Sequence, residues 1–341
     1  MRAILVQQPG GPEVLSVGEA PEPLPGAGDL LVQVHAAGLN RADLLQRMGR
    51  YPPPPGESDL LGLEVAGEVI SAGSGCEGRG PGGRTYRPGD RVMALLAGGG
   101  YAERARVPAA QALPIPPGLT FTEAAAIPEV FLTAYLNLVH IGRLAPGEVV
   151  VVHAAASGVG TAGLQLCRGV ASVVLATASA GKLESLRQFG ATHLLARDQV
   201  AGGKALAEAV RAAAGRGADL VFDLVGGSYL EANTAALGLH GRLCCIATAG
   251  GAKATLDLGA LLGKRLSVYG STLRTRSAEQ KARLCERFAA EVLPRFEPGA
   301  ALGLSPVLAK VFAFEEVRAA HALLEANEVV GKVVLDLGEA A

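Results

Sequence analysis

One stretch restricts the possible folds more than any other: "HAAASGVG" at residues 153–160, which follows the apolar run "EVVVV" and opens the helical pattern "GTAGLQLCRG". A strand, a tight glycine turn and a helix in this order are typical of the phosphate-binding corner of a dinucleotide-binding unit. The backbone N–H groups of Gly158, Val159 and Gly160 can point at a phosphate, helped by the helix dipole. Ser157 stands where a further glycine is expected and adds a hydroxyl donor. An ordinary tight turn is the alternative.

Strand and helix patterns alternate through the middle of the chain. The continuous apolar runs are expected to be strands covered on both faces, and they read "EVVVVHA", "SVVLATA", "THLLA", "DLVFDLV", "GRLCCIAT" and "RLSVYGS". Helical patterns separate them, among them "GKLESLRQFG" and "GKALAEAVRAAAG". This alternation predicts an α/β protein with a doubly wound parallel sheet, the Rossmann fold, of about six strands.

The first part of the chain, up to about residue 123, has short apolar runs broken by Pro and Gly, which predict a β-rich, loop-rich unit. Its segment 75–91 carries much Gly and Arg, and we expect a mobile surface loop there. Helices are expected over 122–142, capped by Thr122, over 277–293 and near 315–326. The last strand, "GKVVLDL", is expected to rejoin the first domain. The predicted domains are therefore 1–123 with 273–341, and 124–272.

Composition argues against several classes of protein. The net charge of −1 gives no global field that favours nucleic acid or a membrane surface. The five cysteines are scattered without a C-x-x-C pair, which argues against a disulfide framework and indicates a reducing compartment. The apolar run at the start ends at Pro9, and no stretch is expected to reach transmembrane length. We expect a soluble, cytoplasmic protein.

The second strand of the predicted dinucleotide unit ends in "LATASAGK". Sites for NAD place an acid here, about 20 residues after the glycine turn, to bind the ribose 2′-hydroxyl. Residues 177–180 contain none, and the first acid, Glu184, lies within the next helical pattern. A small polar pocket with Ser179 beside Lys182 suits a 2′-phosphate and favours NADPH. A solvated lysine is the alternative for Lys182.

Motifs along nearly the whole chain resemble the zinc-free quinone oxidoreductases of the medium-chain dehydrogenase/reductase superfamily, which include zeta-crystallin. The motifs are "GLNRADLLQRMGRYPPPPG", "LGLEVAGEV", "GDRVMALLAGGGYAE", "TEAAAIPEVFLTAY", "HAAASGVGTAGLQL" and "ANEVVGKVVLDL". The tumour-suppressor-inducible quinone oxidoreductase subgroup is the most similar. The resemblance implies a GroES-like catalytic domain, split in sequence, around a Rossmann domain, with the site in the cleft between them.

The resemblance also allows a test for zinc. The zinc-dependent branch of the superfamily has Cys in "G-x-C-x-x-D" and His in "G-H-E", where this chain has Asn40 and Leu63. Zinc is bound by Cys, His or carboxylate groups, so Asn and Leu cannot replace these ligands. We therefore expect no metal site, and we interpret Glu64 as mainly structural.

Several positions match cofactor-binding residues of the family. Arg197 stands where relatives have Tyr; it can bind a phosphate or stack on adenine, or be a surface arginine without function. Ala247 replaces a glycine beside the nicotinamide ribose, and "GSTLRT" (270–275) matches the loop that faces the carboxamide. The cofactor-binding residues that the resemblance implies are Asn40, Thr133, Ser157, Gly158, Val159, Gly160, Ser179, Lys182, Arg197, Ala247, Thr272, Leu273 and Asn327.

Reduction of a quinone places negative charge on oxygen, so hydrogen-bond donors aimed at that oxygen lower the barrier. Asn40 and Tyr51 are the candidates for catalytic residues, the latter on the stiff "YPPPP" loop. An exposed tyrosine held by its prolines is the alternative. The predicted function is an NADPH-dependent quinone reductase that acts without zinc.

Two other functions stay open at this point. One is a 2-alkenal or enoyl-thioester reductase, which shares the fold and the cofactor. The other is a non-enzymatic role, as a nucleic-acid-binding or crystallin-like protein, and the net charge makes nucleic acid an unfavoured partner. Relatives pair the strand at 264–273 across a two-fold axis, so the resemblance implies a homodimer through this edge, where Leu266, Val268 and Tyr269 would otherwise be exposed.

Overall fold

A computed structural model describes residues 1–200 and 204–338, and the chain divides into two compact units. We call Thr133–Thr272 the continuous unit, and Met1–Leu132 with Leu273–Ala341 the discontinuous unit. The chain therefore passes between units at 132–133 and 272–273, where the sequence analysis placed the boundaries at 123–124 and 272–273.

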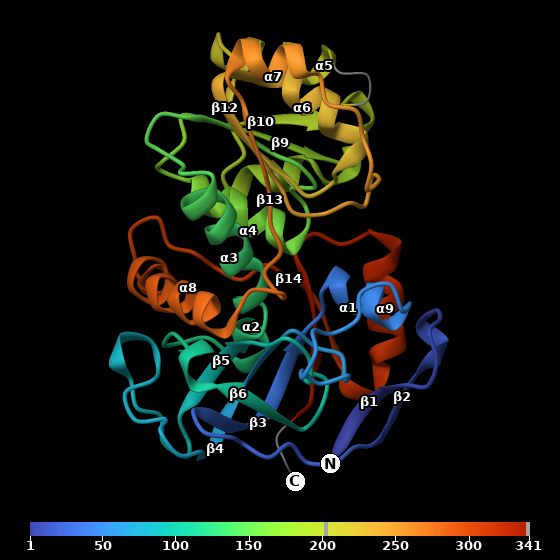
Figure 1. The fold of residues 1–341 in the computed structure, drawn as a ribbon, viewed down its shortest axis with the longest axis vertical. Coiled ribbons are helices and arrows are strands. Elements are labelled where there is room, and N and C mark those ends of the chain that lie inside the picture. The colour runs from blue at the N-terminus through green and yellow to red at the C-terminus, as the bar shows by residue number, and fades with distance from the viewer. Residues whose placement is uncertain (201–203, 339–341) are drawn as a thin grey trace. The chain divides into compact units, whose positions relative to one another are not determined.

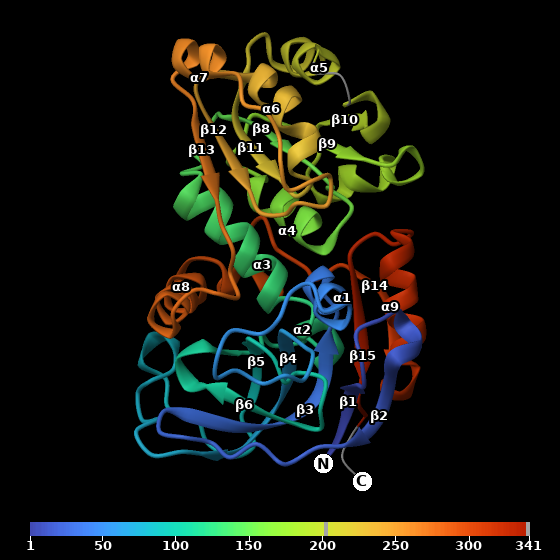
Figure 2. The same ribbon diagram turned by 45° about the vertical axis from the view of Figure 1, so that its right-hand side comes forward.

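The continuous unit is built on a six-stranded sheet in the order β10-β9-β8-β11-β12-β13, in which the neighbouring strands are parallel. Figure 2 shows these strands side by side. Their bounds are β8 Val149–Val152, β9 Val173–Ala178, β10 His193–Ala196, β11 Ala218–Asp223, β12 Leu237–Cys245 and β13 Ser267–Gly270. The order reverses between β8 and β11, as in a doubly wound dinucleotide fold. The predicted Rossmann sheet of six strands is confirmed.

Burial explains why these runs form strands. All four residues of β8 are buried, because helices or turns cover both faces of the sheet. The helices of this unit are α4 Gly158–Cys167, α5 Lys204–Ala214, α6 Leu230–Ala236 and α7 Leu258–Lys264, and it also holds the end of α3 Pro128–Tyr135, from Thr133 onward. One predicted helix is wrong: "GKLESLRQFG" forms two short 3₁₀ helices, η5 Ala180–Lys182 and η6 Glu184–Phe189, which end at Gly190 with φ 119°.

The discontinuous unit is built on a mostly antiparallel sheet in the order β14-β15-β3-β4-β5-β7, with β6 paired to β3 and a separate hairpin of β1 and β2 (Figure 1). The bounds are β1 Arg2–Val6, β2 Leu15–Glu19, β3 Asp29–Gly38, β4 Glu64–Ala72, β5 Arg91–Leu95, β6 Arg104–Pro108, β7 Ala112–Pro114, β14 Leu308–Ala313 and β15 Lys332–Asp336. Strand β15 pairs with β3, so the prediction that the last strand rejoins the first domain is confirmed.

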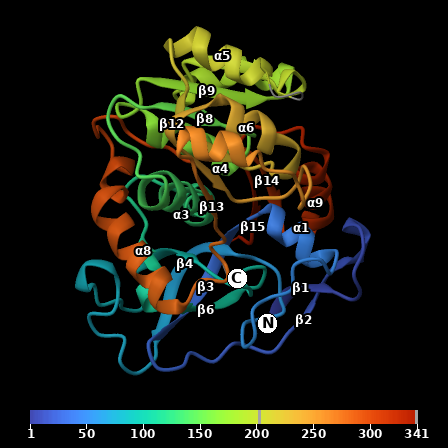
Figure 3. The same cartoon turned by 45° about the horizontal axis from the view of Figure 1, so that its top comes forward.

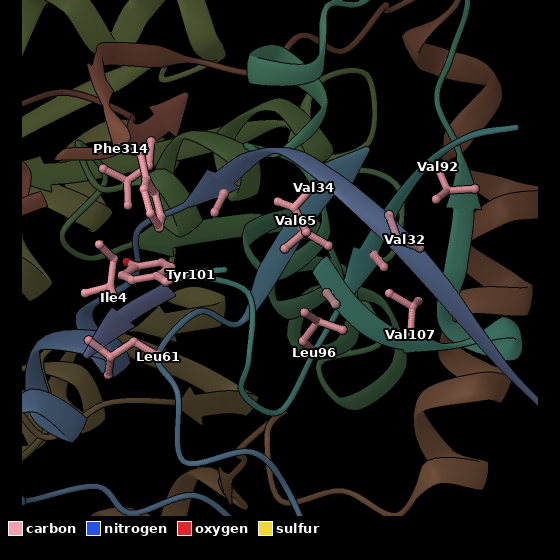
Figure 4. Packing of buried hydrophobic residues seen from close by; sticks show 14 of the residues in the cluster. Ile4, Val32, Val34, Leu61, Val65, Val92, Leu96, Tyr101, Val107 and Phe314 are labelled. Atoms are coloured by element: carbon pink, nitrogen blue, oxygen red, sulfur yellow. The ribbon is translucent and has the colours of Figure 1, made fainter. Parts of the chain in front are cut away.

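Alternating side chains of these strands pack into one core, in which Val32, Val65, Val92, Val107 and Phe314 are buried (Figure 4). The helices of this unit are α1 Arg41–Arg47, α2 Phe121–Ala124, α8 Ala278–Glu291 and α9 Val317–Ala326. Helices α1 and α9 are far apart in sequence but lie side by side in Figures 1, 2 and 3. The chain returns from the continuous unit to complete both the core and the sheet.

One further expectation about this unit is wrong, and another concerns a segment whose packing was not predicted. The cap of the helix near residue 121 is Thr120, whose hydroxyl accepts the N–H of Glu123, rather than Thr122. The segment 75–91 packs against its own unit: Cys76 and Tyr86 are buried, and the hydroxyl of Tyr86 donates to the carbonyl of Ala112 at 2.7 Å. Two buried side chains anchor a loop whose composition alone suggests mobility.

One segment, Phe121–Ile141, is long and apolar enough to cross a membrane by length and composition, with a mean hydropathy of 1.4. No stretch of this length was predicted from the sequence. Since 78% of its 18-residue apolar window is buried inside the structure, it has the character of a core helix.

Candidate functional site

Register in the parallel sheet brings the predicted cofactor residues of the continuous unit to one edge. Ala178 pairs with Ala196, so Ser179 and Arg197, which follow them, leave neighbouring strands at the same end. Val152, which precedes the glycine turn, pairs with Ala176 on β9. Ligands of doubly wound folds bind outside the carboxyl ends of the strands, where the strand order reverses. The candidate cofactor site of this unit lies at this edge.

The glycine turn begins α4 as predicted. The hydroxyl of Ser157 caps the helix and accepts the N–H of Gly160 at 3.0 Å, and the hydroxyl keeps its own O–H as the donor that was predicted for a phosphate. The N–H of Gly160 is therefore paired with the cap in this structure, and its contact with a phosphate stays a prediction. Helix geometry leaves the N–H groups of Gly158 and Val159 without intrahelical acceptors, and they start the helix at its positive end.

Close packing explains why Gly160 is required. A Cβ at this position would lie 2.5 Å from the carbonyl oxygen of Ala154 and 2.6 Å from the Cα of Ala155. Ala154 itself has φ 46°, in the left-handed region that favours glycine. The turn is tight enough to strain one alanine and to exclude a side chain at its last glycine.

Below the turn lies a buried polar chain that sequence reasoning missed. His153 is completely buried, with Nδ1 2.8 Å from the hydroxyl of Thr177 and Nε2 2.6 Å from the amide oxygen of Asn233. The amide of Asn233 in turn donates to Asp223, which also accepts the N–H groups of Val225 and Gly226. Burial lowers the pKa of His153 to about 4, so the imidazole is neutral at neutral pH. These hydrogen bonds connect the ends of β8, β9 and β11.

Ser179, Lys182 and Arg197 are the residues predicted to bind the 2′-phosphate, and they follow the neighbouring strands β9 and β10 at the same edge of the sheet. Lys182 is half-buried in η5, and its N–H donates to the carbonyl of Ser179 at 2.9 Å. Arg197 is exposed, and its carbonyl accepts the hydroxyl of Tyr229 at 3.1 Å. Its backbone is thus anchored while the guanidinium stands in solvent. Two cations at the end of β9 and β10, and no acid among residues 177–180, fit a phosphate better than a hydroxyl.

The nicotinamide end of the predicted site is held by Asn137, a residue that the sequence analysis did not select. Its side-chain amide donates to the carbonyl of Thr133 at 2.9 Å, and its amide oxygen accepts the hydroxyl of Ser271 at 2.7 Å. This joins Thr133 to the loop that contains Thr272, which is exposed. Ala247 follows β12 at the same edge, where its carbonyl would clash at 2.5 Å with a Cβ on Gly226.

In the discontinuous unit, Asn40 belongs to a buried ionic cluster. The ammonium of Lys332 lies 2.6 Å from Glu64 and donates to the amide oxygen of Asn40 at 2.8 Å. The Asn40 amide donates to Glu64 at 2.9 Å, and the other carboxylate oxygen of Glu64 accepts the N–H of Glu129. This supports the structural interpretation of Glu64. It also means that one N–H of the Asn40 amide is committed to Glu64, which weakens Asn40 as a donor to substrate.

Asp43, three residues after Asn40, is a second buried acid that sequence reasoning missed. It accepts the N–H groups of Asn40 and Gly62 and the hydroxyl of Tyr101. Burial raises its pKa to about 6 despite these hydrogen bonds. Asp43 fixes the start of α1 and the 62–63 turn, where Leu63 is buried.

Tyr51 is half-buried, and Arg274 holds it. The guanidinium of Arg274 lies 5.2 Å from the ring centroid, and its Nη1 donates to the carbonyl of Tyr51 at 3.2 Å. Arg274 also donates to the carbonyl of Ala97 and to the side chain of Gln46 on α1. Burial raises the pKa of Tyr51, while the charge of Arg274 opposes that rise. Arg274 stands in the "GSTLRT" motif, next to the residues that were selected.

The two remaining predicted residues have clear structural roles. Leu273 is buried in the discontinuous unit. Asn327 ends α9 with φ 56°, and its amide oxygen accepts a hydrogen bond from Arg41. Arg41 follows Asn40, so Asn327 lies close to the start of α1.

The described ranges contain no group of three or more His, Cys, Asp or Glu side chains placed to hold a metal ion.

Comparison with known proteins gives matches over most of the chain. Residues 26–117 match the alcohol dehydrogenase GroES-like domain, and residues 158–289 match the zinc-binding dehydrogenase family. The human synaptic vesicle membrane protein VAT-1 homolog is 39% identical over 67% of this chain, and the match covers 56% of that protein, so the chain spans about half its length. Rat quinone oxidoreductase is 28% identical over 98% of this chain and 97% of its own length.

Solved structures match the whole fold. The structure of mycobacterial Rv1454c in complex with NADPH superposes with a TM-score of 0.85 and 29% identity, covering 98% of this chain and 99% of that one. The expected fold class, a GroES-like β-rich domain with a Rossmann sheet, is confirmed by this match and by the two domain matches.

Proposed function

Since this chain belongs to the medium-chain dehydrogenase/reductase superfamily and is an oxidoreductase of that family, we propose that it is an NADPH-dependent quinone reductase. The observation that carries the cofactor choice is the end of β9: residues 177–180 hold no acid, and Lys182 and Arg197 follow β9 and β10 at the same edge of the sheet. An acid there would repel a 2′-phosphate, whereas the two cations attract it. The NADPH bound to the mycobacterial neighbour agrees with this choice.

The residues present fit a dinucleotide. The free N–H groups of Gly158 and Val159 would hold the pyrophosphate at the positive end of α4, and the absent side chain of Gly160 lets the turn close under it. Ser179, Lys182 and Arg197 would hold the 2′-phosphate, and Thr133, Ala247 and Thr272 would border the nicotinamide. When bound, NADPH supplies a hydride; the protein supplies position and electrostatic field.

On the substrate side, we propose that Tyr51 orients the quinone. Its ring is fixed by Arg274, and in the described part of the chain its hydroxyl has no hydrogen-bond partner, which leaves it available as a donor to a developing oxyanion. Quinone is proposed as substrate because the chain resembles rat quinone oxidoreductase along its length and shares the motifs of the tumour-suppressor-inducible subgroup.

We propose that the reaction proceeds without zinc. Asn40 is bonded to Lys332 and Glu64, and Leu63 is buried, so neither position offers a ligand. Exhaustive chelation is expected to leave activity intact, and elemental analysis is expected to find less than one zinc per chain. Stoichiometric zinc that is lost together with activity would overturn the proposal.

Steady-state assays test the function. With NADPH, turnover of a 1,2-quinone or a 1,4-quinone is expected to exceed turnover of a crotonyl thioester. The opposite ranking would identify the chain as an enoyl-thioester or 2-alkenal reductase, which needs the same fold and cofactor. Absence of turnover with every acceptor, together with salt-dependent retention of RNA, would favour a non-enzymatic role.

We also propose that the protein is a cytoplasmic homodimer. The cysteines of the described ranges are free, as a reducing compartment requires. Strand β13 stands at the edge of its sheet with Val268 and Tyr269 partly exposed, and α7 carries the exposed Leu258 and Leu262. Leu266, in contrast, is buried and does not contribute to this edge. An exposed apolar edge strand of this kind tends to pair with another chain, because its backbone N–H and C=O groups lack partners.

A further inference from the structure

The discontinuous unit contains a pocket of about 230 Å³ that the proposed reaction does not use. Its walls come from the end of β5, from β6, from the short helix η3 Ala109–Gln111 and from the first turn of α8. The lining side chains that carry charge or an amide are Glu57, Arg106, Gln111, Arg276 and Lys281. Three cations and one carboxylate therefore face a single space.

Lys281 is the strongest sign of a ligand. Only 4% of this residue is exposed, and within the described ranges no hydrogen bond or ion pair holds its ammonium. Burial lowers the pKa of Lys281, and the charge of Glu57 opposes this effect only in part. Buried charges are normally paired, so the ammonium lacks the partner that such a position requires.

Two other lining groups are also unsatisfied in the part of the chain that the structure describes. Gln111 is 5% exposed, and its side-chain amide makes no hydrogen bond there. The Nε of Arg276 is buried without a hydrogen-bond partner. A buried polar atom without a partner, such as Nε of Arg276, is seldom found in native proteins, and here it stands beside two largely buried polar side chains, Lys281 and Gln111, that line the same pocket.

The helix adds to the positive field. Helix α8 has 14 residues and starts at the pocket, where Ala278 lies in the wall. Its cap is complete, because Ser277 accepts the N–H of Gln280. The helix dipole still places partial positive charge at this end, beside Arg276 and Lys281.

We propose that this pocket is an oxyanion site that binds a phosphate group, either free or in a small phosphate ester. Lys281 and Arg276 supply charge and Gln111 supplies an amide donor, which together suit a group with several acceptor oxygens. The volume is below that of pockets for drug-sized ligands, so the organic part of an ester must be small.

Glu57 also lines the pocket, and its negative charge allows a second test of phosphate binding. Its carboxylate lines the pocket, is exposed and raises the pKa of Lys281 through its charge. It therefore competes with an incoming anion for the same ammonium. Replacing it by Gln removes that competition, and Glu57→Gln is expected to tighten phosphate binding.

Calorimetric titration of the full chain with inorganic phosphate tests the site, at constant ionic strength set with chloride. The wild type is expected to bind saturably and to show a rise in Tm with phosphate concentration, by linkage. Lys281→Met is expected to weaken the Kd by about tenfold or more, the loss of one charge-assisted contact. Gln111→Leu serves as a second variant that preserves the charge of the chain.

Arg283→Met is the matched control, since Arg283 lies on the same helix and its side chain is 77% exposed in a surface pair with Glu279. It removes the same charge and is expected to leave the phosphate Kd unchanged.

Without phosphate, Lys281→Met is expected to be at least as stable as wild type, because a largely buried charge is lost. Tighter binding of glycerol phosphate than of phosphate would assign the site to esters, and equal binding to the free ion. No saturable binding in the wild type, or equal Kd values in wild type and Lys281→Met, would overturn the site.

Discussion

At the scale of single residues, the buried charges of the discontinuous unit depend on partners that come from distant parts of the chain. Lys332 and Glu64 are separated by most of the sequence, yet both are almost completely buried and lie 2.6 Å apart. Each is tolerated only because the other is present, since taking a single charge out of water costs several kcal/mol.

Lys332→Met is therefore expected to destabilise the protein by about 3–5 kcal/mol, because Glu64 remains as an unpaired buried carboxylate. The double variant Lys332→Met with Glu64→Gln is expected to recover most of that loss. Urea unfolding of the wild type, both single variants and the double variant measures the coupling. Strict additivity of the two single changes would contradict this account of the pair.

His321 gives a prediction about pH. Burial, and then the charge of Arg47, lowers its pKa to about 3. The unfolded chain therefore binds more protons than the folded chain from about pH 6.5 downward, and the free energy of unfolding falls as pH is lowered in this range. Asp43, with its pKa raised to about 6 by burial, acts in the opposite direction.

The contribution of His321 is isolated by comparison with His321→Gln, which can still accept a hydrogen bond from Arg47. Between pH 7 and pH 4.5, a range that passes through the ordinary pKa of 6.5 and stays above the shifted value of about 3, the variant is expected to lose less stability than wild type. Urea midpoints at a series of pH values measure this. Parallel curves would show that His321 does not titrate on unfolding.

Tyr51 gives a prediction about catalysis. Tyr51→Ala removes the ring under Arg274 and is expected to lower kcat/KM for quinone, while the Kd for NADPH changes less than about threefold, under 1 kcal/mol. Tyr51→Phe keeps the ring and separates its role from that of the hydroxyl, which is expected to contribute about 1–3 kcal/mol as a donor. Wild-type turnover by Tyr51→Ala would reduce this residue to a loop anchor.

At the scale of elements, the glycine turn between β8 and α4 is the most constrained segment. A Cβ on Gly160 would meet backbone atoms of Ala154 and Ala155, which cannot move without opening the turn. Gly263 in α7 has open space around an added Cβ, so it is a matched control in a helix of the same unit.

Gly160→Ala is expected to lower Tm and to weaken NADPH binding, because the strain falls on the backbone that carries Gly158 and Val159. Gly263→Ala is expected to raise stability by about 0.5–1 kcal/mol, since alanine favours a helix interior. Thermal unfolding with and without NADPH measures both. Equal Tm values for the two variants would contradict the close packing of the turn.

The sequence predicted those elements whose signal is local. Runs such as "VVVV" and the 3.6-residue periodicity of α8 carry their own structure, so the Rossmann sheet and the closing strand were predicted correctly. The contacts of segment 75–91 were not predicted, because they come from two buried residues and from α8, where Gly82 donates to Glu286. Arg274, Asp43 and Lys332 were missed for the same reason: no periodicity marks a polar side chain whose partners arrive from elsewhere in the chain.

At the scale of the whole molecule, the exposed edge of the Rossmann sheet leads to a prediction about assembly. Light scattering at micromolar concentration is expected to give the mass of a dimer. Val268→Lys places a charge on the edge strand and so opposes its pairing with another strand. This variant is expected to give the mass of a monomer with unchanged circular dichroism. The control is Val311→Lys on β14, which is 40% exposed on the edge strand of the other sheet and is expected to leave the dimer intact. A monomeric wild type would remove the proposal.

The position of β15 has a consequence for synthesis on the ribosome. This strand lies between β14 and β3, and its Lys332 is the counterion of Glu64, so a nascent chain that has emerged as far as the Rossmann unit cannot yet complete the sheet that it began. The continuous unit is a compact unit formed by one uninterrupted stretch of chain, 133–272, so it can fold while the ribosome is still adding residues. The N-terminal strands must wait with an unmatched carboxylate and an open sheet edge, and during that interval they are the part of the chain most in need of a chaperone.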